Sequence, residues 1–206
     1  MSGTHHHSQD KRRCLPAYGG NAEAILARIE SLLPKDADGE FLAFKPGATG
    51  AEEKSDVVHD FLACLAEQMI EMNKEKKAQT RRFLQWLETE MGHPVNELRL
   101  KTKLREFHEG DFDALLGAIK ANDKLLGRMA HRSGFQEDLR REFDASMAAL
   151  GPLKQRIAAT DWLIDQIVYR LYGLTPDEVA VVEDRAGRES SDEASQPTSE
   201  DAPDGG

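Results

Sequence analysis

The sequence is poor in the residues that build disulfide frameworks, zinc sites and membrane-spanning segments. It has two cysteines, Cys14 and Cys64, and aromatic residues make up 6% of its 206 residues. Two cysteines without metal-ligand spacing predict neither a zinc site nor a disulfide framework, so we expect a cytoplasmic protein. No apolar run approaches the roughly 18 residues that a membrane-spanning helix needs, so no membrane partner is expected. The N-terminal stretch MSGTHHHSQDKRR has no apolar core behind it, and no signal peptide is predicted.

Catalytic motifs are missing as well. The chain contains no nucleophile elbow, no Walker loop and no paired metal-ligand histidines. Its four internal histidines, His59, His93, His108 and His131, are scattered, and we interpret each as a surface or helix-end residue. The one pairing that we single out is His108 beside Glu109. We therefore predict no catalytic residue, no metal ion and no enzymatic activity for this chain alone.

Charge is distributed unevenly along the chain. The formal net charge is −10, and the segment 183–206 holds eight acidic and two basic residues, a net of −6. The remaining 182 residues therefore carry −4. Because the acidity is largely a property of the tail, the body of the chain is compatible with an anionic partner.

Apolar residues recur at intervals of three and four, and strand patterns are nearly absent, which predicts an all-α fold. The main helix should start from a cap at Ser55 or Asp56 and run to about Met91. A helix of about 35 residues is longer than a small globular domain needs and is typical of a coiled-coil arm.

A second long element is predicted from Ser133 to Tyr172, with a kink or break near Leu150 because Gly151 and Pro152 interrupt it. One helix starting at Pro94 should run to about Phe107, and another to about Leu126. The two long elements bury their apolar stripes best as elongated antiparallel arms, a coiled-coil-like bundle closed at one end by the 95–126 helices.

These patterns divide the chain into four segments. Residues 1–20 are predicted to be a disordered N-terminus, and 21–50 a short helix capped by Asn21 followed by a linker. A small apolar cluster in that linker, Phe41, Leu42 and Phe44, is either a short strand or a docking element. Residues 51–184 form the helical domain, and 185–206 a disordered acidic tail.

The most informative stretch is TDWLIDQIVYRLYGLTPDEVAVVE, residues 160–183. Gly173 stands where a left-handed glycine ends a helix. Thr175 is then an N-cap, Pro176 the first helical residue, and Glu178 completes a capping box. The local prediction is a helix, a sharp corner and a short second helix.

This corner resembles the C-terminal end of TaqI-like (type IIG) restriction–modification DNA adenine methyltransferases. In that family an LVYxLYGLTxxE corner follows the target-recognition region, and the segment 54–109 here resembles the helical region upstream of it. The resemblance covers residues 40–183. It implies a parent enzyme that methylates adenine in DNA with S-adenosylmethionine, sometimes with an endonuclease activity.

The catalytic part of that family is not in this sequence. The Asn/Asp-Pro-Pro-Tyr/Phe motif that holds a flipped base is missing, and so is a glycine-rich turn for S-adenosylmethionine. The resemblance therefore implies a non-catalytic C-terminal helical module without a cofactor of its own. It would be a fragment, a split subunit or a separate subunit, with DNA and a methyltransferase domain, in cis or in trans, as partners.

Two basic clusters are candidates for DNA contact through phosphates. The first comprises Lys74, Lys76, Lys77, Arg81 and Arg82, and the second comprises Arg99, Lys101, Lys103 and Arg105. For the first cluster a solvated helix face is favoured, because Glu71 and Glu75 lie at ion-pairing distance along the helix. For the second cluster both interpretations remain open.

The same helical stripes support an alternative function. A stand-alone coiled-coil interaction or adaptor protein, with no role on DNA, would show the same apolar periodicity. Exposed apolar surface would favour this alternative, whereas salt-sensitive DNA binding through Lys101, Lys103 and Arg105 would favour the first.

Overall fold

The computed structural model of the chain describes residues 22–33, 35 and 52–195. This part contains six α-helices and no strand, which confirms the all-α fold class. It forms two compact units, one made of Ala63–Trp162 and the other of the described residues within Gly19–Leu62 and Leu163–Gly206. The predicted 51–184 domain therefore spans both units. The predicted disordered N-terminus, the Asn21 cap and the 41–44 apolar cluster lie outside the described residues.

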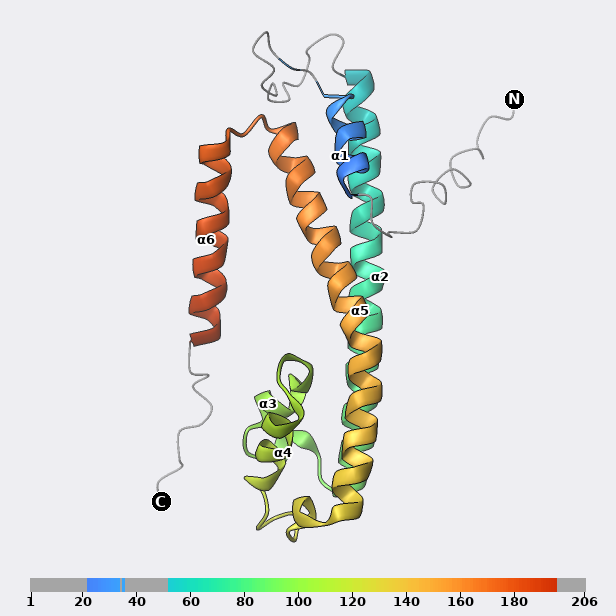
Figure 1. Cartoon of the computed structure of the whole chain (residues 1–206), viewed down its shortest axis with the longest axis vertical. Coiled ribbons are helices and arrows are strands. Elements are labelled where there is room, and N and C mark those ends of the chain that lie inside the picture. Colours follow the sequence, from blue (N-terminus) through green and yellow to red (C-terminus); the bar gives the residue numbers. More distant parts are fainter. Residues whose placement is uncertain (1–21, 34, 36–51, 196–206) are drawn as a thin grey trace, which may run out of the picture. The chain divides into compact units, whose positions relative to one another are not determined.

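The Ala63–Trp162 unit is built on two long helices, α2 (Glu52–Met91) and α5 (Ser133–Leu171). Within this unit the helices run side by side in opposite directions, as the stripes predicted (Figure 1). Helix α2 ends at Met91, as predicted, and the following Gly92 takes a left-handed φ of +68°. Its start was predicted wrongly, because the helix begins at Glu52 and both predicted cap residues lie inside it.

The segment 92–132, which we call the cap, joins these helices through short elements. They are the 3-10 helix η2 (Val95–Glu97), α3 (Lys101–Arg105), η3 (Phe107–Glu109), α4 (Phe112–Lys120) and η4 (Met129–His131). The prediction of one continuous helix from Pro94 is therefore wrong. Leu100 takes a left-handed φ of 58°, so the preceding turn ends there and α3 begins as a separate helix. The next helix ends at Lys120 rather than near Leu126, and a series of turns follows it.

Four phenylalanines join the cap to both long helices. The Phe107 ring stacks on Phe83 of α2 with centroids 4.0 Å apart, and meets Phe143 of α5 edge-on at 6.2 Å. Phe112 of α4 approaches Phe143 edge-on at 5.7 Å. Burial of each such side chain stabilises the fold by about 1.5–3 kcal/mol, so the cap belongs to the core of its unit. The same core includes Leu87, Met91, Val95, Leu98, Leu104, Leu115, Ile119, Leu126, Leu139 and Leu150.

Helix α5 continues through Pro152, so the predicted break near Leu150 is wrong. Proline lacks an N–H group and cannot donate to the carbonyl four residues earlier. Leu150 and Leu153 on either side of it are buried, whereas Pro152 itself is exposed. Packing of these leucines holds the helix together at its weakened turn.

The second unit contains α1 (Ala22–Glu30), the start of α2, the end of α5 and α6 (Pro176–Ser195). The Arg170 Nε of α5 donates to Glu30 Oε1 of α1 at 2.8 Å, which ties two ends of the sequence together. The buried apolar residues of this unit are Leu26, Ile29, Leu33, Val58, Leu163, Ile167 and Leu171.

The corner between α5 and α6 has the predicted geometry. Gly173 has a φ of +63°, and the Leu174 N–H reaches back to the Tyr169 carbonyl at 3.0 Å. Both the backbone N–H and the hydroxyl of Thr175 donate to Glu178 Oε2 at 2.9 Å. In return the Glu178 N–H donates to the Thr175 hydroxyl at 3.3 Å, which completes the capping box.

Helix α6 is longer than predicted. It runs to Ser195, through the stretch after Arg185 for which we predicted disorder, and residues 196–206 lie outside the described part. The capped start and the absence of proline between Pro176 and Pro197 allow this extension.

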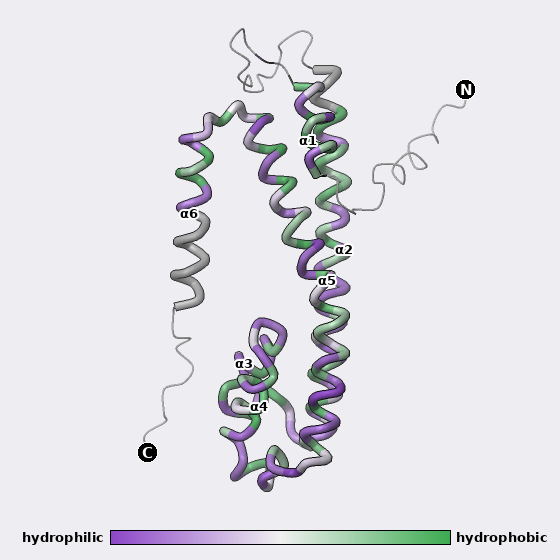
Figure 2. The backbone as a smooth tube through the Cα atoms, in the orientation of Figure 1, coloured by the Kyte–Doolittle hydropathy of each residue, from purple (hydrophilic) through white to green (hydrophobic). Residues whose placement is uncertain are grey.

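Hydrophobic and hydrophilic residues alternate along the coloured parts of α2 and α5 (Figure 2). This alternation is typical of helices that bury one stripe and leave the other in water. Among the described residues, no helix has the length and apolar content required to cross a membrane.

Candidate nucleic-acid interface

The second predicted cluster lies on the cap, on the turn before α3 and on α3 itself. Arg99, Lys103 and Arg105 are exposed, and Lys101 is half-buried. The Arg105 guanidinium donates to the Asn96 amide oxygen, a neutral acceptor, at 2.5 Å. The cluster therefore presents its positive charge on the surface of a short helix that the buried Leu104 anchors.

A buried asparagine fixes the position of this turn. Asn122, which is 5% exposed, accepts the Arg99 N–H through Oδ1 at 2.7 Å and donates through Nδ2 to the Arg99 carbonyl at 3.0 Å. The same amide also donates to the Ala118 carbonyl at 3.0 Å. We call the two hydrogen bonds between Asn122 and Arg99 the clasp. It joins the turn before α3 to the turns after α4.

The end of α4 and the turns after it carry a third basic group, which was not singled out from the sequence. Its members are Lys120, Lys124, Arg128 and Arg132, all of them exposed. Their regular spacing of four is visible in the sequence, but the only feature predicted for this segment was the end of a helix near Leu126. The role of Asn122 left no sequence signal, because nothing local marks an asparagine that bonds to a turn 23 residues away.

Several acidic groups of the cap are held by internal partners. Glu109 Oε2 lies 2.6 Å from Lys154 Nζ, Asp123 pairs with His131, and Asp111 caps α4 by accepting from the Ala114 N–H at 2.8 Å. Three further acids, Glu97, Glu106 and Asp113, remain exposed.

The basic side chains of the cap make fewer contacts with charged partners within the protein than its acidic side chains do. Within the described part of the chain, none of the following makes an ion pair: Arg99, Lys103, Arg105, Lys120, Lys124, Arg128 and Arg132. The cap therefore exposes more unneutralised positive than negative charge.

The first predicted cluster lies on α2 and is partly used within the protein. Lys74 Nζ lies 2.7 Å from Glu71 Oε1, the pairing expected from the helix spacing. Lys76 Nζ is half-buried and lies 3.9 Å from Glu109 Oε1. The other three members of the cluster, Lys77, Arg81 and Arg82, are exposed.

The pair singled out from the sequence, His108 and Glu109, lies at the junction of the cap with α2 and α5. His108 Nδ1 is 2.9 Å from Glu109 Oε1, and Lys154 Nζ of α5 donates to the His108 carbonyl at 3.1 Å. Burial lowers the pKa of His108, and the positive charges of Lys76 and Lys154 lower it further. The negative charge of Glu109 acts in the opposite direction but does not cancel these effects. The imidazole is therefore neutral near pH 7.

Partial burial by itself would raise the pKa of Glu109. The hydrogen bond and charge of Lys154, together with the charges of His108 and Lys76, outweigh this effect, so the pKa of Glu109 lies below its ordinary value. Its carboxylate stays ionised, pairs with Lys154 of α5 and lies 3.9 Å from Lys76 Nζ of α2. This arrangement fastens the cap to α2 and α5.

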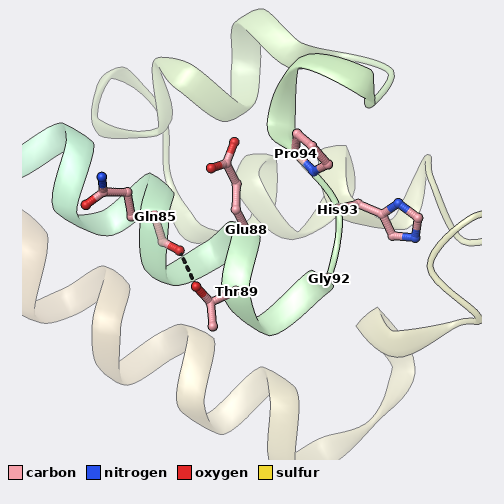
Figure 3. Close-up of a pocket in the computed structure, with 6 residues that line it drawn as sticks. All are labelled: Gln85, Glu88, Thr89, Gly92, His93 and Pro94. Carbon is pink, nitrogen blue, oxygen red and sulfur yellow. Dashed lines mark hydrogen bonds between the residues drawn. The ribbon is translucent and has the colours of Figure 1, made fainter.

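A shallow open pocket of about 400 Å³ lies where α2 meets the cap. Figure 3 shows its lining, Gln85, Glu88, Thr89, Gly92, His93 and Pro94. The Glu88 carboxylate accepts the Val95 N–H at 2.8 Å, and the Thr89 hydroxyl donates to the Gln85 carbonyl at 2.8 Å. These two groups therefore bond within the C-terminal end of α2 and to the start of the cap.

The described residues also lack a cluster of three or more His, Cys, Asp or Glu side chains that could hold a metal ion. What the cap can do chemically is bind an anion through several separate cationic side chains, which is how proteins contact nucleic-acid phosphates.

Comparison with known proteins identifies one family. No curated protein matches the chain, and no solved structure does. A family model described as "Domain of unknown function (DUF8810)" matches residues 55–168, which include the cap and most of both long helices. Because that match covers more than half of the 206 residues, the chain belongs to the DUF8810 family.

Proposed function

We propose that this chain is a cytoplasmic, non-catalytic helical module of a site-specific DNA adenine methyltransferase of the restriction–modification kind. It supports target recognition by holding DNA through phosphates, while methylation with S-adenosylmethionine takes place on a separate domain or subunit. The observation that carries the DNA role is the exposed basic segment 99–105, held on a packed cap by Asn122.

The geometry of this segment suits a phosphate contact. Asn122 fixes the backbone of the turn, so less backbone entropy is lost when its side chains bind. Arg99, Lys103 and Arg105 are exposed and make no ion pair with a described carboxylate, so little internal pairing has to break, and counterion release then drives association. The overall charge of −10 does not oppose this role, because most of it lies in the C-terminal segment.

The link to a methyltransferase comes from the resemblance of the α5–α6 corner to the C-terminal end of TaqI-like enzymes. The Gly173 turn and the Thr175–Glu178 capping box are formed here, so the string behaves as a structural corner. Sequencing upstream of the codon for Met1 tests the link. A reading frame with an Asn-Pro-Pro-Tyr-type motif supports it, and an unrelated gene speaks against it.

Binding to duplex DNA tests the phosphate role directly. The full chain should bind a fluorescent 20-base-pair duplex at low salt, with an affinity that falls as salt rises. Replacing Lys101, Lys103 and Arg105 by alanine should reduce the slope of log affinity against log salt by about 0.9 for each phosphate that is no longer neutralised.

The matched control replaces the same number of exposed cations on α2: Lys77, Arg81 and Arg82. This control should leave binding nearly unchanged. Equal losses of affinity in both triple variants would mean that net charge, and not the cap, governs binding.

One observation favours the alternative of a helical adaptor. Tyr172 at the corner and Val181 and Val182 on α6 are 62%, 58% and 43% exposed. Exposed apolar side chains of this kind are what a protein-binding face uses. If the chain fails to bind DNA at low salt but associates with another protein through these residues, the adaptor function replaces the DNA role.

A further inference from the structure

Two residues of the cap hold a backbone conformation that normally selects glycine. Leu100 has φ 58° and ψ 34°, and Arg128 has φ 58° and ψ 30°. They are the only non-glycine residues with positive φ in the described part of the chain. The left-handed conformation costs an L-residue about 1–2 kcal/mol, and glycine at either position would avoid most of that cost.

Burial does not explain why these positions carry large side chains. Leu100 is 42% exposed, and Arg128 is exposed as well. Where the chain needs the same conformation elsewhere, at Gly92, Gly127 and Gly173, it uses glycine. A strained backbone that displays a side chain to solvent indicates that the side chain itself has a use.

The clasp brings these two positions into neighbouring turns. On one side, the Asn122 side chain is hydrogen-bonded to the backbone of Arg99, the residue before Leu100. On the other side, the Asn122 backbone carbonyl accepts hydrogen bonds from the N–H groups of Leu125 and Leu126, both at 2.9 Å. Leu125 is 50% exposed. The two turns joined by Asn122 therefore expose two isolated leucines on one support.

Cationic residues surround both leucines in sequence. Arg99 and Lys101 flank Leu100, while Lys124 precedes Leu125 and Arg128 follows three residues later. Such a mixture suits a duplex, where phosphates border the apolar deoxyribose and base edges of a groove. Single-stranded nucleic acid would need exposed aromatic rings for stacking, and the aromatic rings of the cap, Phe107 and Phe112, are buried.

We propose that the two turns joined by the clasp form a duplex-DNA contact in which Leu100 touches the sugar and base-edge surface of a groove. Arg99, Lys124 and Arg128 hold the bordering phosphates, and Leu125 extends the apolar contact. This proposal rests on the proposed DNA-binding function and names the side chains that would perform it. It explains why the backbone strain at Leu100 is retained.

The decisive variant is Leu100→Gly, because it relieves backbone strain while it removes the apolar side chain. The melting temperature of the full chain should stay the same or rise, and affinity for the 20-base-pair duplex should fall about tenfold. The salt slope should stay unchanged, since no charge is removed. Leu100→Asn, which tolerates the left-handed conformation, should weaken binding in the same way.

Two controls separate an apolar DNA contact from other roles. Ile70→Ala removes a side chain that is 54% exposed on α2, and it should leave affinity unchanged. Arg128→Gly relieves strain and removes one charge, so it should lower both the affinity and the salt slope, the slope by about 0.9.

The possible failures are distinguishable. If the cap triple variant binds weakly but Leu100→Gly and Leu100→Asn bind like the wild type, the Leu100 contact is overturned and the phosphate role stands. If the unmodified chain does not bind duplex at low salt, both proposals fail. If Leu100→Gly instead loses stability, or loses binding to phosphatidylserine vesicles but not to DNA, Leu100 is a structural or a lipid-facing residue and the proposal is wrong.

Discussion

Two basic regions of the Ala63–Trp162 unit use their charges differently. On α2, Lys74 is bound to Glu71 and Lys76 lies beside Glu109. On the cap, exposed cations without carboxylate partners lie on turns that Asn122 holds in place. The sequence shows the two regions as similar runs of lysine and arginine. The comparison shows that nearby acids neutralise some cations of a run and leave others available to an anionic partner.

The largest expected effect comes from removing the ring that anchors the cap. Phe107→Ala deletes a side chain that is 2% exposed and contacts rings of both long helices, and it should destabilise the fold by about 3–5 kcal/mol. Urea denaturation followed by circular dichroism measures the decrease in stability. DNA binding should weaken with it, since the cap is disrupted while α2 retains its lysines.

Ile70→Ala, at an exposed position of α2, is the control for Phe107→Ala and should change stability by less than about 1 kcal/mol. If Phe107→Ala unfolds at nearly the wild-type urea concentration, the cap is not part of the core.

Removing the clasp should have the next largest effect. Asn122→Ala leaves the N–H and carbonyl of Arg99 without their partners and should cost about 1–3 kcal/mol. It changes no charge, yet it should weaken DNA binding because the basic turn loses its support. Asn73→Ala is the matched control, since Asn73 bonds only to the Met69 carbonyl of its own helix. Equal DNA affinity in Asn122→Ala and the wild type would show that the clasp does not position the binding surface.

Acidic pH should weaken the contacts of His108 and Glu109 that join the cap to α2 and α5. Lys76 of the α2 cluster lies beside Glu109 in this group. The pKa of His108 in the folded state lies below its ordinary value of 6.5, chiefly because of burial. The unfolded chain therefore takes up a proton first, and stability falls as the pH drops below about 6.5.

The pKa of Glu109 is lowered from 4.5, so its stabilising contribution is present above that pH and is lost as the pH falls through the folded-state value. Melting temperatures from pH 8 to pH 4 should therefore decline, and His108→Gln should remove the part of the decline that begins near neutral pH. Parallel curves for His108→Gln and the wild type would contradict this assignment.

The smallest expected effect comes from making the α2 cluster resemble the cap. Glu71→Gln releases Lys74 from its ion pair and should cost at most about 0.5 kcal/mol of stability, because the pair is exposed. DNA affinity and the salt slope should stay nearly unchanged, because the DNA contact is proposed on the cap. Glu137→Gln, an equal charge change on α5, serves as the control. A gain of affinity in Glu71→Gln that Glu137→Gln does not show would mean that the released Lys74 contacts DNA and that the contact is not confined to the cap.

The sequence allowed the local features of the fold to be predicted. The end of α2 at Met91, the left-handed Gly173 and the Thr175–Glu178 capping box all depend on residues within one or two helical turns of each other. Fold class and antiparallel pairing also followed, because the 3.6-residue period of the apolar stripes is itself a local pattern.

The features that were missed depend on contacts between distant residues. The left-handed turn at Leu100 is held by Asn122, and neither residue is one that local preference would select for its role. The continuity of α5 across Pro152 depends on the burial of Leu150 and Leu153. The basic residues 120–132 became a candidate surface only once the clasp connected them to the 99–105 segment.

The aromatic contacts of Phe107 also bear on how the chain folds. Phe83 and Phe143 are 60 residues apart in sequence, but Phe107 contacts both of them, at separations of 24 and 36 residues. Closing two shorter loops in succession is less demanding than closing one long loop before any contact forms, because closure entropy increases with loop length. The cap should therefore be structured early, and α5 should pair with α2 only after Phe107 has packed against its first partner.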